Sequence, residues 1–348
     1  MKKQKIFYLN FIRVISMLFI VTYHFYCHIP ENNIVATNTI FSSGKWGMIG
    51  VVMFFMISGA ALMYNYQEYL DIKKYAVKRF VGIFPMFWIA YASLYLYLFY
   101  QAKANITSLS PFRLIFSVFA MDGYLGCYTP TIYLIGEWFL GCIVIIYVLF
   151  PLYRILVNKY PKITLFVATV LNFALLIFYK NWTMQIDKNL IVASYSFILG
   201  MYAVRINQFK WWQAIIGAII SAVFYMLPAA NHNYQVMFAN LAAYALFVAL
   251  AYVGQKLTNE IVQKIFDIIS KYSYAVFLVH HYIIMKTLST FQGREFGIAG
   301  TVLLYLVCWA QIIILAKLLY MVNDGVIKVF KKSKKEQIKE PNAVLAKE

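Results

Sequence analysis

Ten apolar stretches, each about as long as a membrane-spanning helix, dominate this sequence of 348 residues. A helix needs about 20 predominantly apolar residues to cross a bilayer. The stretches lie at 8–28, 46–64, 80–100, 131–153, 163–179, 190–206, 212–229, 235–254, 272–290 and 298–323. The sequence therefore predicts an all-α fold, a polytopic membrane bundle of about ten transmembrane helices.

The composition agrees with a membrane protein and excludes an ordinary soluble domain. The chain is 63% hydrophobic and only 13% charged, whereas soluble domains are about a quarter charged. Its net charge of +18 would suggest a nucleic-acid partner in a soluble protein. Here the distribution of the basic residues explains the charge, so we expect the lipid bilayer and no nucleic acid as the partner.

The basic residues also predict an orientation. Of the 31 Lys and Arg residues, 22 fall in the N-terminal segment, in alternate loops and in the C-terminal tail, whereas six fall in the other loops. Cytoplasmic segments of membrane proteins carry the excess of positive charge. This predicts a multi-pass protein of the cell membrane with both termini in the cytoplasm.

The chain divides into one long domain and a short tail. Residues 1–327 are predicted to form the transmembrane domain, and 328–348 a basic, disordered cytoplasmic tail. The stretch 111–121 is apolar but too short to cross the bilayer, which predicts an interfacial or re-entrant segment in the third loop.

The first apolar stretch contains two ionisable residues, Arg13 and His24. Eleven residues at 100° each return to nearly the same helix face, and they place the two side chains about 16 Å apart along the axis. Such residues within a span usually face the interior of the bundle or a hydrated cavity. Alternatively, Arg13 extends to the inner membrane surface and His24 bonds a backbone carbonyl near the outer one.

Further polar residues lie in later stretches. Glu137 begins the fourth span at the same predicted membrane side as His24, and His280 and His281 fall in the middle of the ninth. Adjacent helical residues point about 100° apart, so we expect that His280 and His281 do not both face one cavity equally. His28 is interpreted as a loop residue without a role. The sequence lacks GxxxxGK[ST], HExxH and GxSxG motifs and any metal-binding cysteine spacing, so no metal site is predicted.

Five segments resemble the acyltransferase-3 family, whose multi-pass membrane proteins include O-acetyltransferases of bacterial surface glycans. The resemblance covers residues 8 to 320. The most specific mark is the Arg13–His24 pair in LNFIRVISMLFIVTYHF, and the others are GVVMFFMISGAAL (50–62), KRFVGIFPMFW (78–88), WFLGCIVIIYVLFPL (138–152) and YSYAVFLVHH (272–281).

The resemblance implies transfer of an acyl group from cytoplasmic acyl-CoA, with acetyl-CoA as the expected donor, to a hydroxyl of an extracytoplasmic or lipid-linked glycan. His24 is then expected to act as general base or acyl carrier, together with Arg13 and Glu137 as catalytic residues. Arg13, Lys78 and Arg79 would hold the coenzyme phosphates, and His280 and Trp138 would contact the acceptor. No bound prosthetic group is expected.

Two positions depart from the family pattern, and one other function stays open. Gly82 stands where many members have a second arginine, and Ile143 where many have a glutamate, which leaves Glu137 as the nearest acid. The alternative function is a non-enzymatic transporter or flippase of a lipid-linked or small polar substrate. Ten spans with intramembrane charges fit that function too, although inverted repeats are not evident.

Overall fold

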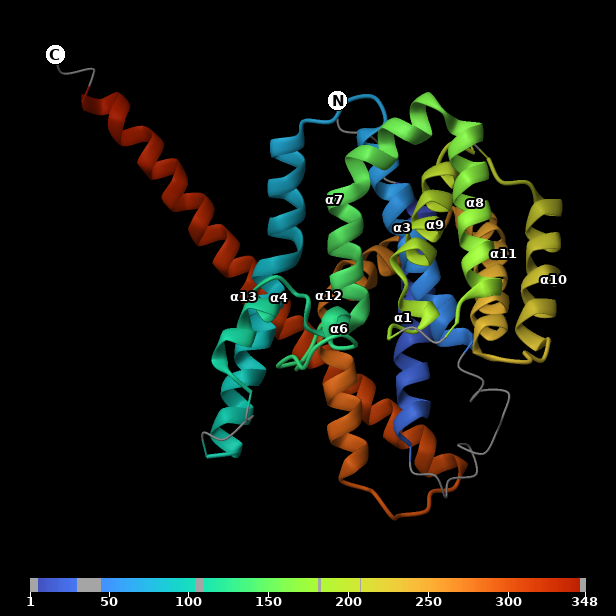
Figure 1. Cartoon of the computed structure of the whole chain (residues 1–348). Coiled ribbons are helices and arrows are strands. Elements are labelled where there is room, and N and C mark those ends of the chain that lie inside the picture. Colours follow the sequence, from blue (N-terminus) through green and yellow to red (C-terminus); the bar gives the residue numbers. More distant parts are fainter. Residues whose placement is uncertain (1–5, 30–44, 104–108, 181–182, 207, 345–348) are drawn as a thin grey trace.

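The computed structural model describes residues 6–29, 45–103, 109–180, 183–206 and 208–344, and this part of the chain is almost entirely helical (Figure 1). The long helices are α1 (Phe7–His28), α3 (Lys45–Tyr66), α4 (Ile72–Gln101), α7 (Glu137–Lys159), α8 (Pro161–Phe178), α9 (Leu190–Ala203), α10 (Trp211–Met226), α11 (His232–Lys256), α12 (Glu260–Ser289) and α13 (Ile298–Val344). These helices correspond one to one to the ten predicted spans, so the predicted all-α membrane bundle is confirmed.

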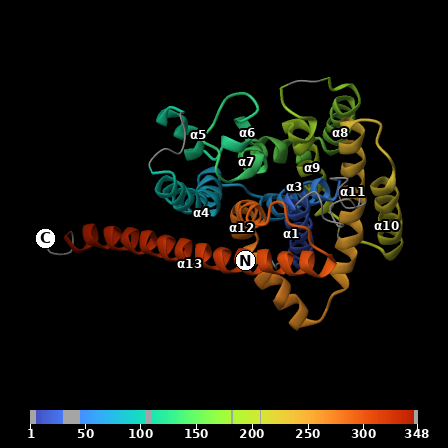
Figure 2. The ribbon, with the colours of Figure 1, turned by 90° about the horizontal axis from the view of Figure 1, so that it is seen from below.

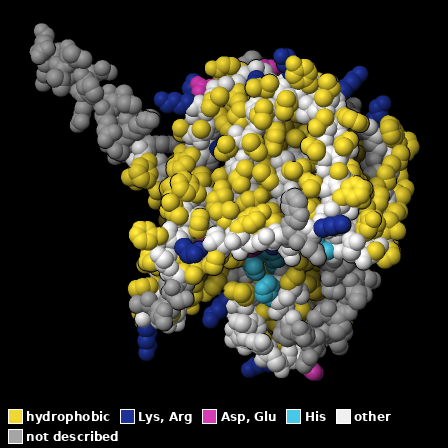
Figure 3. Space-filling view, viewed as in Figure 1, with side chains coloured by type: hydrophobic (Ala, Val, Ile, Leu, Met, Phe, Trp, Pro, Cys, Tyr) yellow, Lys and Arg dark blue, Asp and Glu magenta, His cyan; other side chains and the backbone are white. Residues whose placement is uncertain are grey.

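Seven of these helices in the described part are long and apolar enough to cross a membrane, whereas α9 and α10 are shorter apolar helices. Large hydrophobic side chains cover much of the outer surface. Figure 3 shows Lys and Arg side chains at the upper end of this face and also beside and below a hollow, in which histidines are visible. An apolar exterior is expected of a protein whose solvent is lipid.

Three helices extend furthest beyond the predicted spans, because hydropathy does not mark where a helix begins or ends. α4 begins at Ile72, after Asp71, whose side chain accepts a hydrogen bond from the backbone N–H of Lys74. α12 begins at Glu260 because Asn259 accepts hydrogen bonds from the next backbone N–H groups. α13 continues to Val344, past residue 328, the predicted start of the tail.

The short apolar segment of the third loop, which was predicted not to cross the bilayer, forms small helices. They are η1 (Pro111–Arg113), α5 (Leu114–Val118) and α6 (Asp122–Leu125). The side chain of Phe112 is 89% exposed, whereas α6 packs on α7. Burial raises the pKa of Asp122 to about 6, although the nearby hydroxyl of Ser117 acts in the opposite direction and lowers it. The predicted position at the membrane surface stays a prediction.

Helix α3 lies near the centre of the bundle, and α1 packs against α3, α11 and α12 (Figure 2). Helices α3 and α9 approach each other closely. A Cβ on Gly59 would lie 1.9 Å from the carbonyl oxygen of Phe197, and one on Gly200 would lie 1.9 Å from that of Met56. The two backbones therefore touch directly, as small residues permit in membrane bundles.

We expect Gly200→Ala to destabilise the fold by about 1–3 kcal/mol, because the added methyl group overpacks a rigid backbone contact. The measurement is the midpoint of thermal unfolding of the purified protein in detergent. Gly325→Ala is the matched control, since a Cβ on Gly325 meets no atom within 4 Å. Equal midpoints for the two variants would contradict tight packing of α3 on α9.

Candidate functional site

A cavity of about 520 Å³ runs through the interior of the bundle. Residues from α1, α3, α4, α7, α9, α11 and α12 line it, together with the short helix η2 (Ile186–Lys188). Arg13 and His24 both belong to this lining. One helix therefore presents a guanidinium and an imidazole to the same cavity, about three helical turns apart.

Neutral polar side chains hold Arg13 at the junction of α1 and α12. Its Nη1 donates to the side-chain oxygen of Asn10 and to the hydroxyl of Ser270, both at 3.0 Å. The Asn10 amide in turn donates to Asp267 Oδ1 at 2.6 Å. Because both direct partners of Arg13 are neutral, they orient the guanidinium without cancelling its charge.

Arg79 faces the same end of the cavity, whereas Lys78 does not. The guanidinium of Arg79 lies 5.6 Å from the ring centre of Tyr147, and its buried Nε has no hydrogen-bond partner. Lys78 is exposed, lies over the ring of Tyr66 and is not part of the cavity lining. The structure thus brings together two of the three residues that were predicted to hold the coenzyme.

His24 is held by His280, which is completely buried on α12. Nδ1 of His24 lies 2.8 Å from Nε2 of His280, and Nδ1 of His280 faces the carbonyl oxygens of Phe277 at 2.8 Å and Val276 at 3.2 Å. A nitrogen that faces carbonyl oxygens must carry hydrogen. When both rings are neutral, His280 Nε2 is then the acceptor, His24 donates from Nδ1, and Nε2 of His24 keeps a free lone pair.

Glu137 lies beside this histidine pair and bonds the third ring. Its Oε1 accepts a hydrogen bond from Nδ1 of His281, whose ring centre is 4.6 Å from that of His24. The helix that carries Glu137 begins after Gly136, which has φ of +91°, a conformation that favours glycine. Burial and the carboxylate of Glu137 raise the pKa of nearby Tyr133.

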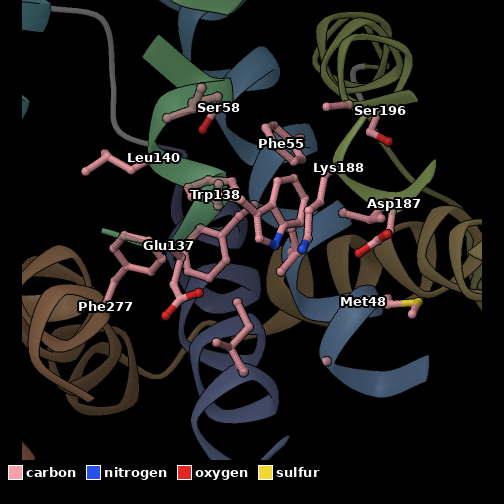
Figure 4. A pocket seen from close by; sticks show the side chains of 18 of the residues that line it. Met48, Phe55, Ser58, Glu137, Trp138, Leu140, Asp187, Lys188, Ser196 and Phe277 are labelled. Atoms are coloured by element: carbon pink, nitrogen blue, oxygen red, sulfur yellow. The ribbon is translucent and has the colours of Figure 1, made fainter. Parts of the chain in front are cut away.

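Of the two residues predicted to contact the acceptor, Trp138 lines the cavity and His280 does not. Trp138 lines the cavity next to Glu137 (Figure 4). His280 lies behind His24 and outside the lining, so it contacts His24 where contact with substrate was predicted. Ile143 belongs to the lining, which leaves Glu137 and Asp187 as the carboxylates among the described lining residues.

Sequence reasoning missed the contact of His281 with His24 and the position of His28. His28 is the last residue of α1 and not a loop residue, and its ring lies 5.1 Å from that of His281. His280 and His281 both contact His24, because its ring lies between theirs. The ring centre of His24 is 4.9 Å from that of His280 and 4.6 Å from that of His281. The adjacent histidines in YSYAVFLVHH were the signal, but their shared partner is on another helix.

The family comparison agrees with this architecture. The family model described as an acyltransferase domain matches residues 6–320, which is most of the chain. The searches of curated proteins and of solved structures found no match. The matched region includes every helix that lines the cavity, with Arg13, His24, Glu137 and the α12 histidines. The chain therefore belongs to the acyltransferase-3 family of multi-pass membrane proteins.

Proposed function

We propose that this acyltransferase moves an acetyl group from cytoplasmic acetyl-CoA to a hydroxyl of an extracytoplasmic or lipid-linked glycan. The observation that carries the proposal is the single cavity that contains Arg13 toward one end of α1 and His24 toward the other. In this proposal both termini are cytoplasmic and Arg13 lies at the cytoplasmic end.

The residues at that end suit the phosphates of an acyl-CoA donor. The hydrogen-bond partners of Arg13 are neutral, and the buried Nε of Arg79 has no hydrogen-bond partner. Both guanidinium groups line the cavity, and guanidinium groups bind phosphate oxygens with paired donors. The thin pantetheine arm would extend from there toward His24, with the thioester within reach of the imidazole.

His24 would act as the general base. Its Nε2 takes the proton of the acceptor hydroxyl while the hydroxyl oxygen forms a bond with the thioester carbonyl carbon. The C–S bond then breaks and the coenzyme thiolate leaves. The imidazolium of His24 returns the proton to this thiolate, which gives free coenzyme A. The nearby carboxylate of Glu137 favours the positive imidazolium that forms between these steps.

A second route uses the same lone pair as a nucleophile. In that case Nε2 of His24 attacks the thioester carbonyl carbon, the C–S bond breaks and the coenzyme thiolate leaves. The acceptor hydroxyl oxygen then attacks the acyl-imidazole, the N–acyl bond breaks, and the hydroxyl proton returns to the imidazole. Exchange of labelled coenzyme A into acetyl-CoA in the absence of acceptor separates the routes, because only the second releases coenzyme A before the acceptor reacts.

The test of the proposed function is acyl transfer by the purified protein in lipid nanodiscs. Labelled acetyl-CoA and a cell-envelope glycan extract should yield free coenzyme A and an acetylated glycan in equal amounts, measured by mass spectrometry. A transporter or flippase would move substrate without releasing coenzyme A. Absence of both products from a folded protein would refute the proposal.

We expect Arg13→Ala to raise the KM for acetyl-CoA about tenfold or more, because a charge-assisted hydrogen bond contributes about 1.5–3 kcal/mol. The kcat should change less, since His24 stays in place. Arg205→Ala is the control, because Arg205 bonds Asn158 and lies outside the cavity. An unchanged KM in Arg13→Ala would remove Arg13 from the donor site.

A further inference from the structure

The cavity has a second polar region, away from Arg13. The short helix η2, between α8 and α9, contributes Asp187 and Lys188, the residue before it contributes Gln185, and α11 contributes Asn240. Figure 4 shows Asp187 and Lys188 directed toward the space beside Trp138. We call Trp138, Asp187, Lys188 and Asn240 the η2 arm of the cavity.

The two groups of this arm that lack partners are both hydrogen-bond donors. Asn240 is 98% buried, and its side-chain Nδ2 has no hydrogen-bond partner although it lines the cavity. Lys188 is half-buried, and its side-chain ammonium forms no hydrogen bond or ion pair within the described residues. A buried donor without a partner is costly, which indicates that a ligand or water supplies the missing acceptor.

The carboxylates of the described cavity lining, Asp187 within the arm and Glu137 beside it, each contact a histidine. Asp187 Oδ1 lies 3.3 Å from Nε2 of His232, and Glu137 bonds His281. The ammonium of Lys188 is therefore the charge that remains without a direct partner on this arm. A free ammonium and a free amide N–H together favour a ligand group that only accepts hydrogen bonds and carries negative charge.

We propose that the η2 arm is the acceptor subsite and that it selects a sugar bearing a phosphate or carboxylate group. This inference rests on the proposed function, since it identifies the acceptor of that reaction. Lys188 and Asn240 would bind the anionic group, and the ring of Trp138 would pack against the apolar face of the sugar. The acceptor hydroxyl is thereby directed toward Glu137 and His24.

Equilibrium binding tests this subsite without depending on catalysis. The purified full-length protein in nanodiscs is titrated by calorimetry with glucose, glucuronate and glucose 1-phosphate, which share one sugar ring. We expect at least one anionic sugar to bind about tenfold more tightly than glucose or better, as charge-assisted contacts predict. Glucuronate and glucose 1-phosphate distinguish a carboxylate of the glycan from a phosphate at its linkage end.

Two pairs of variants locate the binding. Lys188→Gln and Asn240→Ala should each remove most of the preference for the anionic sugar. Lys180→Gln is the control for charge, because Lys180 is exposed outside the cavity, and Asn172→Ala is the control for a buried unpaired amide elsewhere. Both controls should retain the preference.

Three results would overturn the proposal. They are equal binding of glucose and the anionic sugars, no binding of either anionic sugar, and an unchanged preference in Lys188→Gln. The acyl-transfer assay is read separately with acetyl-CoA and glycan extract. Absence of an anion preference in the wild-type protein together with intact transfer would refute the subsite alone, whereas the expected anion preference without transfer would refute the proposed function alone.

Discussion

Replacement of His24 by alanine is expected to lower the rate of acetyl transfer by about 10²–10⁴-fold, the usual contribution of a general base. The reason is geometric. His24 lines the cavity, and its Nε2 is the nitrogen that keeps a lone pair, since Nδ1 donates to His280. Insertion and thermal stability should change little, because the side chain borders open space on one side. The measurement is the steady-state rate of coenzyme A release with glycan acceptor.

His28→Ala is the matched control for this variant. His28 lies one turn further along α1, and its Nδ1 is 2.9 Å from the backbone oxygen of His24. It does not line the cavity, so most of the activity should remain. Normal acetyl transfer by His24→Ala would contradict both proposed routes, because each requires the lone pair of this ring.

The sequence predicted the fold well because membrane spans are defined by a property of single segments. A run of about 20 apolar residues must form a helix in lipid, whatever its neighbours are. The ends of the helices depend on other signals. The caps Asp71 and Asn259 extend α4 and α12 into polar sequence, which hydropathy assigns to loops.

The candidate site was only partly predictable, because most of its contacts join different helices. The shared face of Arg13 and His24 follows from the period of one helix. The contact between His24 and His280 joins residues 256 positions apart, so no local pattern contains it. For the same reason the sequence did not indicate that Lys188 and Asn240 line one cavity, since η2 has only three residues and no hydrophobic period.

The buried His280 offers a test of how the lone pair of His24 is fixed. We expect His280→Phe to lower kcat about 10²-fold or more, because the phenyl ring keeps the volume but accepts no hydrogen bond from Nδ1 of His24. Without that acceptor, His24 can place its hydrogen on Nε2, and loss of the correct tautomer costs up to about 10⁴-fold in serine proteases. The KM for acetyl-CoA should stay nearly constant, since Arg13 and Arg79 are untouched.

The variant His280→Gln separates this positioning role from simple packing. Its amide can donate to a backbone carbonyl with its nitrogen and accept from His24 with its oxygen, as His280 does. We therefore expect His280→Gln to recover much of the activity that His280→Phe loses, at equal amounts of folded protein. If both variants are equally inactive, or if His280→Phe retains full kcat, then His280 does not set the tautomer of His24, and the free lone pair needs another explanation.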